Sequence, residues 1–342
     1  MAIIALRVTG VVSLVSILVS CASAGGATNF GTVNLVWPES PSPARIVYRG
    51  YIHRKEDLGI TRSLLERVKG LLFGESTLTV VKPMDVLVTG QSVYVADPGV
   101  GGVHHFDEAG AGHEVVRMEN DQALPSPVAL ALGDDRIYVS DPTLGVLHFS
   151  EKSQVARLYP LSEKPKQATG LAYNRRTKVL FVSDTAEHHI KVYDESGKLM
   201  RVLGRRGDVD GQFNFPTYLW LDQQENLYVS DSLNFRVQVF SSNGEFKYKF
   251  GQAGNATGYQ ARPKGIAVDR LGHIYVVDSL FHVVQVFDAG GRFLLNFGTQ
   301  GSDFGEFWLP TGIFIDTISN AIYIADSYNK RVQVFRYVGG ES

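Results

Sequence analysis

Six β-rich runs that each end in an aspartate predict an all-β fold, a six-bladed β-propeller. The aspartates are spaced by 44, 43, 47, 47 and 48 residues along a chain of 342, and they are Asp97, Asp141, Asp184, Asp231, Asp278 and Asp326. A period in the forties, filled with short Val, Ile, Tyr and Phe segments, is typical of propeller blades. Most of the 35 glycines fall at turns between these segments. The length therefore indicates one closed ring rather than several domains.

Composition removes several classes of protein. The chain contains one cysteine, so it cannot form an internal disulfide, a cysteine-rich zinc module or a cysteine-ligated iron–sulfur cluster. Lys and Arg number 33 against 35 Asp and Glu, for a net charge of −2. Nucleic-acid binders normally carry a basic excess, so we expect no nucleic-acid partner. No cofactor is predicted.

Residues 1–20 are predicted to be a signal peptide. Arg7 is their only charge, and the apolar run of about 12 residues is shorter than the roughly 20 that a membrane-spanning helix needs. The run ends in Leu18-Val19-Ser20-Cys21, which resembles the lipobox of bacterial lipoproteins. The resemblance implies cleavage before Cys21 and lipidation of its thiol. Cleavage after Ala24, which would give a secreted protein, and an uncleaved membrane anchor remain alternatives.

The residues after the cysteine bear on location. Ala22 stands where lipoproteins retained in the inner membrane of Gram-negative bacteria often carry Asp, so the resemblance implies the bacterial cell envelope and its outer membrane. Residues 21–44 are rich in Gly, Ala, Ser and Pro and are predicted to form a flexible tether. The propeller is then expected over residues 45–338.

Each repeat divides into four strands, and the fifth shows the pattern most clearly. It predicts strands over 263–269, 274–277, 283–287 and 293–297, separated by Gly-containing turns. The sixth repeat has only three, over 312–315, 322–324 and 332–336. An alternating run over 45–52 lies outside the repeats. We expect it to pair as the outer strand of the last blade and to close the ring.

One segment between that closing strand and the first repeat has helical periodicity. Residues 61–73 place apolar side chains at 64, 65, 68, 71 and 72, which predicts a short amphipathic helix. Thr61 suits its N-cap and Gly74 its end. The helix is expected to pack its Leu stripe on the blades; the alternatives are a lid over the channel mouth or a surface for a partner.

The repeat resembles the NHL repeat. Gly-Ile-Ala-Val-Asp, then Ile-Tyr-Val-x-Asp-Ser, Arg-Val-Gln-Val-Phe and Phe-Gly-x-x-Gly carry the resemblance, most clearly over 215–254, 262–301 and 309–335. The first two repeats depart from it: Pro98 and Pro142 follow their aspartates, and neither has the later Arg. Eukaryotic NHL propellers bind RNA or belong to ubiquitin ligases. This chain lacks the cysteines of a RING domain, and its acidity and signal peptide argue against RNA.

The six repeat aspartates look like a catalytic set, but we interpret them as structural. Each ends a second strand, where its carboxylate can accept N–H groups of the following turn. In two repeats an Arg lies five residues on and can form an ion pair with it, as Asp231 with Arg236 and Asp326 with Arg331. The nine histidines are scattered, and we interpret them as solvated loop residues rather than metal ligands.

Candidate binding residues lie where the innermost strands begin. Most of these positions hold small or neutral residues, as expected where six strands crowd around one axis. Met84, Asp85, Tyr218 and Lys264 are the candidates at the channel mouth, with Lys264 able to face an anion and Tyr218 to stack. Trp220 and Phe314 add bulk further down the channel.

Two functions remain open on sequence alone. A lipid anchor, a tether and a rigid body without a convincing catalytic set favour a non-catalytic envelope scaffold, which binds an envelope protein through a propeller face and the membrane through its lipid. The alternative is a metal-dependent hydrolase or lyase acting on a small molecule in the channel. No catalytic residue is assigned, and the metal and the oligomeric state stay undetermined.

Overall fold

The computed structural model describes residues 34–43, 45–60, 78–110, 112–153 and 155–339. The predicted signal peptide, Cys21 and the predicted helix over 61–73 lie outside these ranges. No helix within them is long and apolar enough to cross a membrane. Their helical segments are short 3₁₀ turns: η1 (Lys55–Leu58), η2 (Glu119–Asp121), η3 (Thr185–Glu187) and η4 (Ser232–Asn234).

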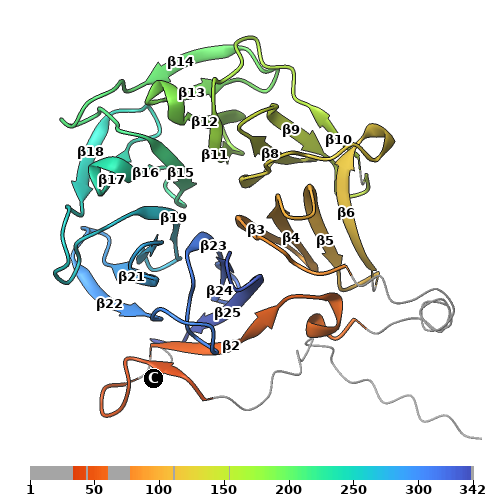
Figure 1. The fold of residues 1–342 in the computed structure, drawn as a ribbon. Coiled ribbons are helices and arrows are strands. Elements are labelled where there is room, and N and C mark those ends of the chain that lie inside the picture. The colour runs from red at the N-terminus through yellow and green to blue at the C-terminus, as the bar shows by residue number, and fades with distance from the viewer. Residues whose placement is uncertain (1–33, 44, 61–77, 111, 154, 340–342) are drawn as a thin grey trace, which may run out of the picture.

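The described chain forms six blades around a central axis (Figure 1), which confirms the predicted propeller. From the inner to the outer strand, blade 1 contains β3 (Asp85–Thr89), β4 (Ser92–Asp97), β5 (Gly102–Asp107) and β6 (Gly112–Met118). Blade 2 contains β7 (Ala129–Leu132), β8 (Ile137–Asp141), β9 (Gly145–Phe149) and β10 (Val155–Leu158). Blade 3 contains β11 (Ala168–Asn174), β12 (Val179–Asp184), β13 (His189–Tyr193) and β14 (Leu199–Leu203).

Blade 4 contains β15 (Pro216–Leu221), β16 (Leu227–Asp231), β17 (Arg236–Phe240) and β18 (Phe246–Phe250). Blade 5 contains β19 (Pro263–Val268), β20 (Ile274–Asp278), β21 (Val283–Phe287) and β22 (Phe293–Phe297). Blade 6 contains β23 (Pro310–Asp316), β24 (Ala321–Asp326) and β25 (Arg331–Tyr337). The predicted strands of the fifth and sixth repeats match these bounds to within about two residues.

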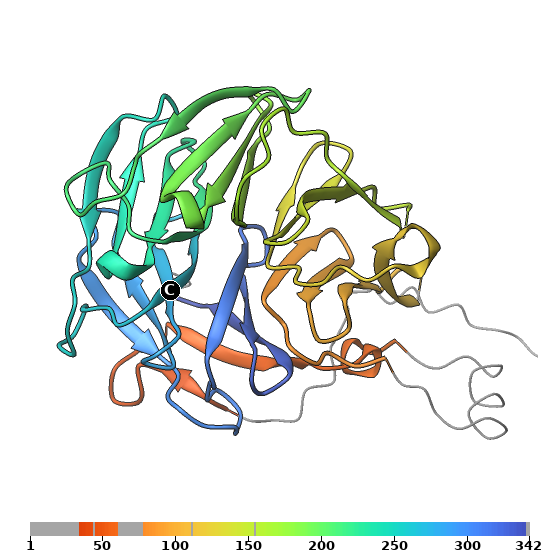
Figure 2. The same ribbon diagram turned by 45° about the horizontal axis from the view of Figure 1, so that its top comes forward.

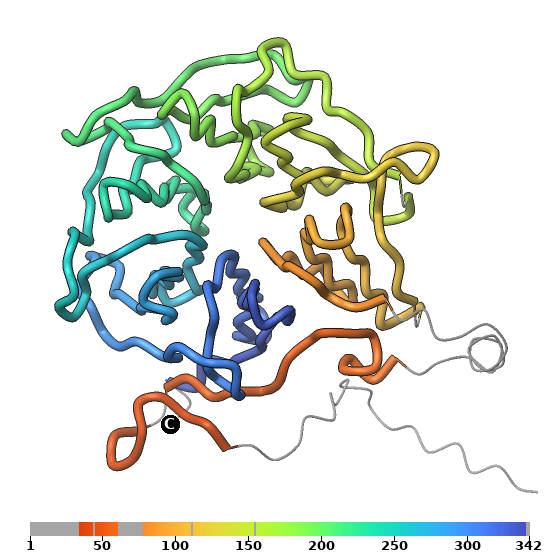
Figure 3. Tube along the Cα trace, in the orientation of Figure 1, coloured from red at the N-terminus to blue at the C-terminus, as the bar shows by residue number. Residues whose placement is uncertain are grey.

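The ring closes as predicted, because an N-terminal strand completes the last blade. β2 (Ile46–Ile52) pairs antiparallel with β25, with Ile46 opposite Tyr337 and Ile52 opposite Val332 (Figure 3). The structure adds β1 (Val36–Trp37), which pairs with β2 and lies within the segment that the sequence analysis assigned to the tether. The Trp37 ring lies 5.7 Å from that of Phe335 and 6.0 Å from that of Phe297. Residues 36–37 are therefore part of the folded body.

Blades 1 and 2 share one eight-stranded sheet, which the sequence did not reveal. Their outer strands β6 and β10 pair in parallel, with Val155 opposite Arg117 and Ala156 opposite Met118. These are the two blades whose repeats depart most from the NHL pattern. The other described blades each form a sheet of their own.

The core lies between the blades. Within the described ranges the buried apolar side chains form six clusters, one at each junction between neighbouring blades. Each blade is a twisted sheet that buries its two faces against the blades on either side. A single blade would leave both faces exposed, so the blades are stable only within the closed ring. The cluster between blades 6 and 1 is the smallest, with seven buried residues that include Ile52 of the closing strand.

Hydroxyl groups also link successive blades. The residue after the blade aspartate donates a hydrogen bond to the carbonyl of the proline that opens the next blade: Thr185 to Pro216, Ser232 to Pro263, Ser279 to Pro310 and Ser327 to Pro83. In blades 1 and 2 this position holds Pro98 and Pro142, which have no hydroxyl. The two divergent blades thus lack this link and have the shared sheet instead.

Candidate functional site

The candidate site is the mouth of the channel on the face where the inner strands begin, which we call the upper face. The turns between second and third strands lie on the same face, because successive strands run antiparallel (Figure 2). The lower face carries the turns that follow the inner strands. Small residues let the inner strands approach: a Cβ at Gly312 would contact the backbone of Met84 and Asp85, and one at Gly170 would overlap the Thr217 carbonyl oxygen.

Tyr218 closes the channel at this mouth. It starts from blade 4, and its hydroxyl donates a 2.8 Å hydrogen bond to the carbonyl of Met84 on the opposite blade 1. The side chain is 6% exposed, and burial raises the pKa of its phenol. A phenol that spans the ring and is fixed at its far end blocks the axis instead of standing free to stack on a ligand.

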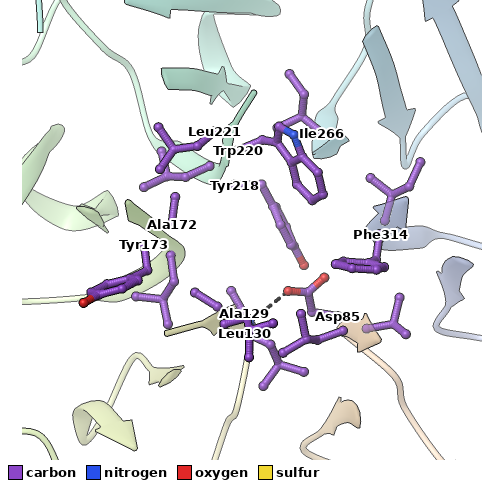
Figure 4. Close-up of a pocket in the computed structure, with 17 residues that line it drawn as sticks. Asp85, Ala129, Leu130, Ala172, Tyr173, Tyr218, Trp220, Leu221, Ile266 and Phe314 are labelled. Carbon is purple, nitrogen blue, oxygen red and sulfur yellow. Dashed lines mark hydrogen bonds between the residues drawn. The ribbon is translucent and has the colours of Figure 1, made fainter. Parts of the chain in front are cut away.

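Asp85 lies beside this phenol, and Figure 4 shows both groups directed into the same cavity. The carboxylate is 7% exposed and accepts a 2.9 Å hydrogen bond from the N–H of Leu130 on blade 2. Burial raises the pKa of Asp85 to about 7, although the N–H groups of Leu130 and Val86 favour the charged form and oppose the shift. This group is therefore partly protonated at neutral pH.

The cavity below is mainly apolar. Asp85 is the one carboxyl among its lining residues, which otherwise are chiefly Val, Leu, Ile, Ala and aromatic side chains from all six inner strands. Trp220 and Phe314 meet edge to face at 6.0 Å within it (Figure 4). The indole N–H of Trp220 has no acceptor among the described residues. Nor do those residues include a group of three or more His, Cys, Asp or Glu side chains placed to hold a metal.

The structure brings together three of the four predicted mouth residues: Met84, Asp85 and Tyr218. Lys264 is the second residue of β19, on the same face, but does not line the cavity. Its ammonium group has no hydrogen-bond partner in the described part of the chain. Burial lowers the pKa of Lys264 to about 8, and the nearby Arg262 cation adds to the shift.

Exposed apolar side chains lie on the upper face of three consecutive blades, 4 to 6, and the sequence analysis did not single them out. They lie in the loops before the inner strands and in the turns after the blade aspartates: Phe215, Leu233, Leu280, Trp308 and Tyr328, each 38–55% exposed. Trp308 and Tyr328 stack with ring centroids 6.1 Å apart. We call these five residues the upper apolar rim. A comparison of turn positions across repeats, rather than of strand positions, could have found them.

The same face carries cations. Lys82, Arg262 and Lys330 are exposed there beside the half-buried Lys264, while Glu187 is already paired with Lys166 at 2.9 Å. Asp208 and Asp303 are also exposed, in the loops that lead into blades 4 and 6. Apolar and cationic side chains together are typical of a surface that recognises a protein with acidic and aromatic groups.

The six blade aspartates lie fully buried, each at its own junction. Asp231 accepts 2.6 Å from the N–H of Asn214, in the loop entering its blade, and 2.8 Å from Arg236 Nε. Asp278 accepts instead from four backbone N–H groups, those of Ala261, Arg262, Leu280 and Phe281. Each carboxylate thus fastens its turn and its entering loop, which explains why the residue recurs.

The structure differs from the expectation of solvated histidines. His104 is fully buried, with Nε2 at 3.2 Å from Asp97 and Nδ1 at 2.9 Å from His113. It lies seven residues after its aspartate, where Gln238 and Gln333 lie in blades 4 and 6. His188 is 8% exposed, and its Nδ1 accepts the N–H of Phe215. His104 thus bonds to its blade aspartate as Gln238 and Gln333 bond to theirs. The positions of the histidines in the sequence did not indicate this structural role.

Fold and site together define a closed six-bladed propeller with an apolar channel. Residues 114–295, more than half of the chain, match the family model described as the Teneurin NHL domain, and residues 269–341 match a model described as a 6-bladed beta-propeller. The chain therefore belongs to the NHL-domain family that the first model describes. No curated protein matches its sequence.

Solved structures agree in fold. A protein of unknown function from Bacteroides thetaiotaomicron superposes with a TM-score of 0.61 at 16% identity, over 77% of this chain and 70% of that one. A protein from the same organism described as an auxiliary nutrient binding protein gives 0.61 at 12% identity, over 75% and 69%. Virginiamycin B lyase from Staphylococcus aureus gives 0.56 at 12% identity, over 75% and 96%. At these identities the likeness concerns the fold alone.

Proposed function

We propose that this protein is a non-catalytic scaffold of the bacterial cell envelope that binds another envelope protein through its upper face. The observation that carries the proposal is the upper apolar rim, five large apolar side chains exposed on the upper face of blades 4 to 6. Exposed apolar side chains gathered on one face are typical of binding surfaces. The neighbouring cations favour an acidic partner.

The structural neighbours include both a binding protein and an enzyme. One structural neighbour is described as a nutrient binding protein and another as a lyase, so the fold serves both roles. The residues of this chain favour binding, because the polar groups of Asp85 and Tyr218 in the channel already bond to the backbone of neighbouring or opposite blades.

Membrane attachment rests on the sequence Leu18-Val19-Ser20-Cys21. Two or more acyl chains on Cys21 would hold the protein stably on a membrane, and the outer membrane is the proposed location. Growth of the producing cells with an alkyne-labelled fatty acid tests this point. Label on the wild-type chain that Cys21→Ser abolishes supports the anchor; an unlabelled mature chain that begins after Ala24 refutes it.

Binding is tested by crosslinking in intact envelopes, with the partner identified by mass spectrometry. Trp308→Ser and Tyr328→Ser should reduce the yield of one stoichiometric crosslinked protein at least tenfold, since buried aromatic anchors dominate interfaces. Ile318→Ser is the matched control, because Ile318 is 92% exposed on the lower face. Equal loss in the control, or no loss in the rim variants, refutes the assignment of the upper face.

The alternative, a metal-dependent hydrolase or lyase in the channel, is tested on the protein purified from the same envelopes. Stoichiometric Ca²⁺ or Zn²⁺ by elemental analysis, lost in Asp85→Ala, would favour it. Full crosslinking activity in a metal-free sample would favour the scaffold.

A further inference from the structure

An arginine clamps the entering loop in blades 4 and 6. Arg236 donates from Nε to Asp231 at 2.8 Å and from its terminal nitrogens to the carbonyls of Asp208, Val209 and Gln212 at 2.7–3.0 Å. Arg331 repeats the arrangement, with Asp326 at 2.9 Å and the carbonyls of Asp303 and Glu306 at 2.6 and 3.0 Å. Both side chains are at least 93% buried, being 5% and 7% exposed.

A glutamine two residues further on completes each clamp. Gln238 Oε1 accepts the N–H of Gly211 at 2.9 Å, and Gln333 Oε1 accepts that of Gly305 at 3.0 Å. Their Nε2 atoms donate to Asp231 and Asp326 at 3.1 and 3.0 Å. All polar atoms of both glutamine side chains are thus bonded.

Blade 5 keeps the glutamine and lacks the arginine. Val283 stands opposite Asp278 in the same strand register that places Arg236 opposite Asp231 and Arg331 opposite Asp326. Gln285 Nε2 donates to the Tyr259 carbonyl at 2.7 Å. Its Oε1 is buried and has no donor among the described residues, although the side chain is only 4% exposed.

A cavity lies where the guanidinium would be. Its lining includes Val283, Gln285 and the loop residues 255–259, which correspond to 208–212 around Arg236. Residues 255–257 are exposed, so the cavity opens to solvent. The carboxylate of Asp278 lies fully buried nearby with backbone N–H partners and no ion pair within the described ranges. The site therefore combines the unused acceptor of Gln285 with a neighbouring carboxylate that is held by backbone N–H groups and lacks the arginine of blades 4 and 6.

We infer that this cavity binds a guanidinium group, contributed by an arginine side chain of a protein partner. The acceptors would be Gln285 Oε1 and the backbone carbonyls of Asn255 and Ala256, which occupy the loop positions of Asp208 and Val209. The Ala256 carbonyl also accepts the N–H of Tyr259 at 2.9 Å, as that of Val209 accepts the N–H of Gln212 at 3.1 Å beside Arg236. Several oxygen acceptors around one cavity match the fork of N–H donors of a guanidinium better than the point charge of an ammonium. Arginine is also the cation most enriched at protein interfaces.

Methylguanidinium is the probe. Titration into the ¹⁵N- and methyl-labelled mature protein should shift the Gln285 side-chain amide and the Val283 methyl signals saturably at millimolar concentration, while methylammonium should bind at least tenfold more weakly. Val283→Arg should abolish both shifts and raise the melting temperature, because it restores the clamp of blades 4 and 6. Gln285→Met keeps the cavity without the free acceptor and should weaken binding, read from the Val283 methyl signals.

Three results would overturn the inference: no saturable shift, an equal response to methylammonium, or unchanged binding by Val283→Arg. This test does not depend on the proposed scaffold function. Methylguanidinium binding with no envelope crosslink would leave the cavity assigned and the upper-face partner refuted.

Discussion

The buried carboxyl of Asp85 should make the stability of the whole ring depend on pH. Its folded-state pKa of about 7 lies above the unfolded value of 3.8, so folding favours the protonated acid. The stability that this proton contributes is present below about pH 4 and is lost as the pH rises towards 7. A difference of about three pKa units corresponds to about 4 kcal/mol in the free energy of unfolding.

Asp85→Asn replaces the acid with a neutral side chain of the same shape whose amide oxygen can still accept the Leu130 N–H. The variant should match the wild type near pH 4 and exceed it by up to about 4 kcal/mol at pH 8. Urea unfolding at four pH values between 4 and 8 measures this difference. Glu114→Gln, at an exposed position, serves as the matched surface control and should change stability by less than about 0.5 kcal/mol.

A constant difference between wild type and Asp85→Asn at every pH would refute the reasoning, because it would show that the carboxyl titrates alike in both states. A variant less stable than wild type at pH 8 would also refute it, since the stronger hydrogen bond from Leu130 to a charged carboxylate than to an amide would then outweigh the cost of the buried charge.

Three further predictions concern the junctions. Gly170→Ala should destabilise the protein by about 1–3 kcal/mol in thermal unfolding, because its Cβ would overlap the Thr217 carbonyl; an unchanged melting temperature would show that the blades can separate freely. Ser232→Ala should cost about 1–3 kcal/mol in urea unfolding, since it removes the partner of the buried Pro263 carbonyl, whereas Ser242→Ala in the partly exposed turn after β17 should have little effect. Gln260→Phe should stabilise by about 1–3 kcal/mol, because the buried Gln260 amide lacks partners among the described residues and the equivalent positions hold Phe213 and Phe307; a lower urea midpoint would contradict this.

The sequence alone was enough to predict the repeats, the blade count and the closing strand. These follow from periodicity, turn residues and a missing strand, which are local properties. It did not reveal the β6–β10 pairing, the burial of His104 or the ordered pair Val36–Trp37, because each depends on distances between blades.

The candidate site was predicted less well for the same reason. Asp85 and Tyr218 were singled out as departures from a pattern of small residues, yet only the structure shows that Tyr218 spans the axis to Met84. Finding the blade 5 cavity required both the comparison of repeats in the sequence and the contacts in the structure. The sequence shows that Val283 stands at the position of Arg236 in blade 4. Only the structure shows that this exchange leaves the Gln285 Oε1 atom without a donor among the described residues.

The position of β1 has a consequence for how the protein would stand on a membrane. The described chain begins at the circumference of the disc, outside β2 of blade 6, and away from either opening of the axis (Figure 1). An anchor attached upstream of this point would hold the disc by its edge. Because the predicted tether is flexible, the disc could turn about this point, and neither broad face would be covered by the attachment, so that one molecule could engage different neighbours on its two sides.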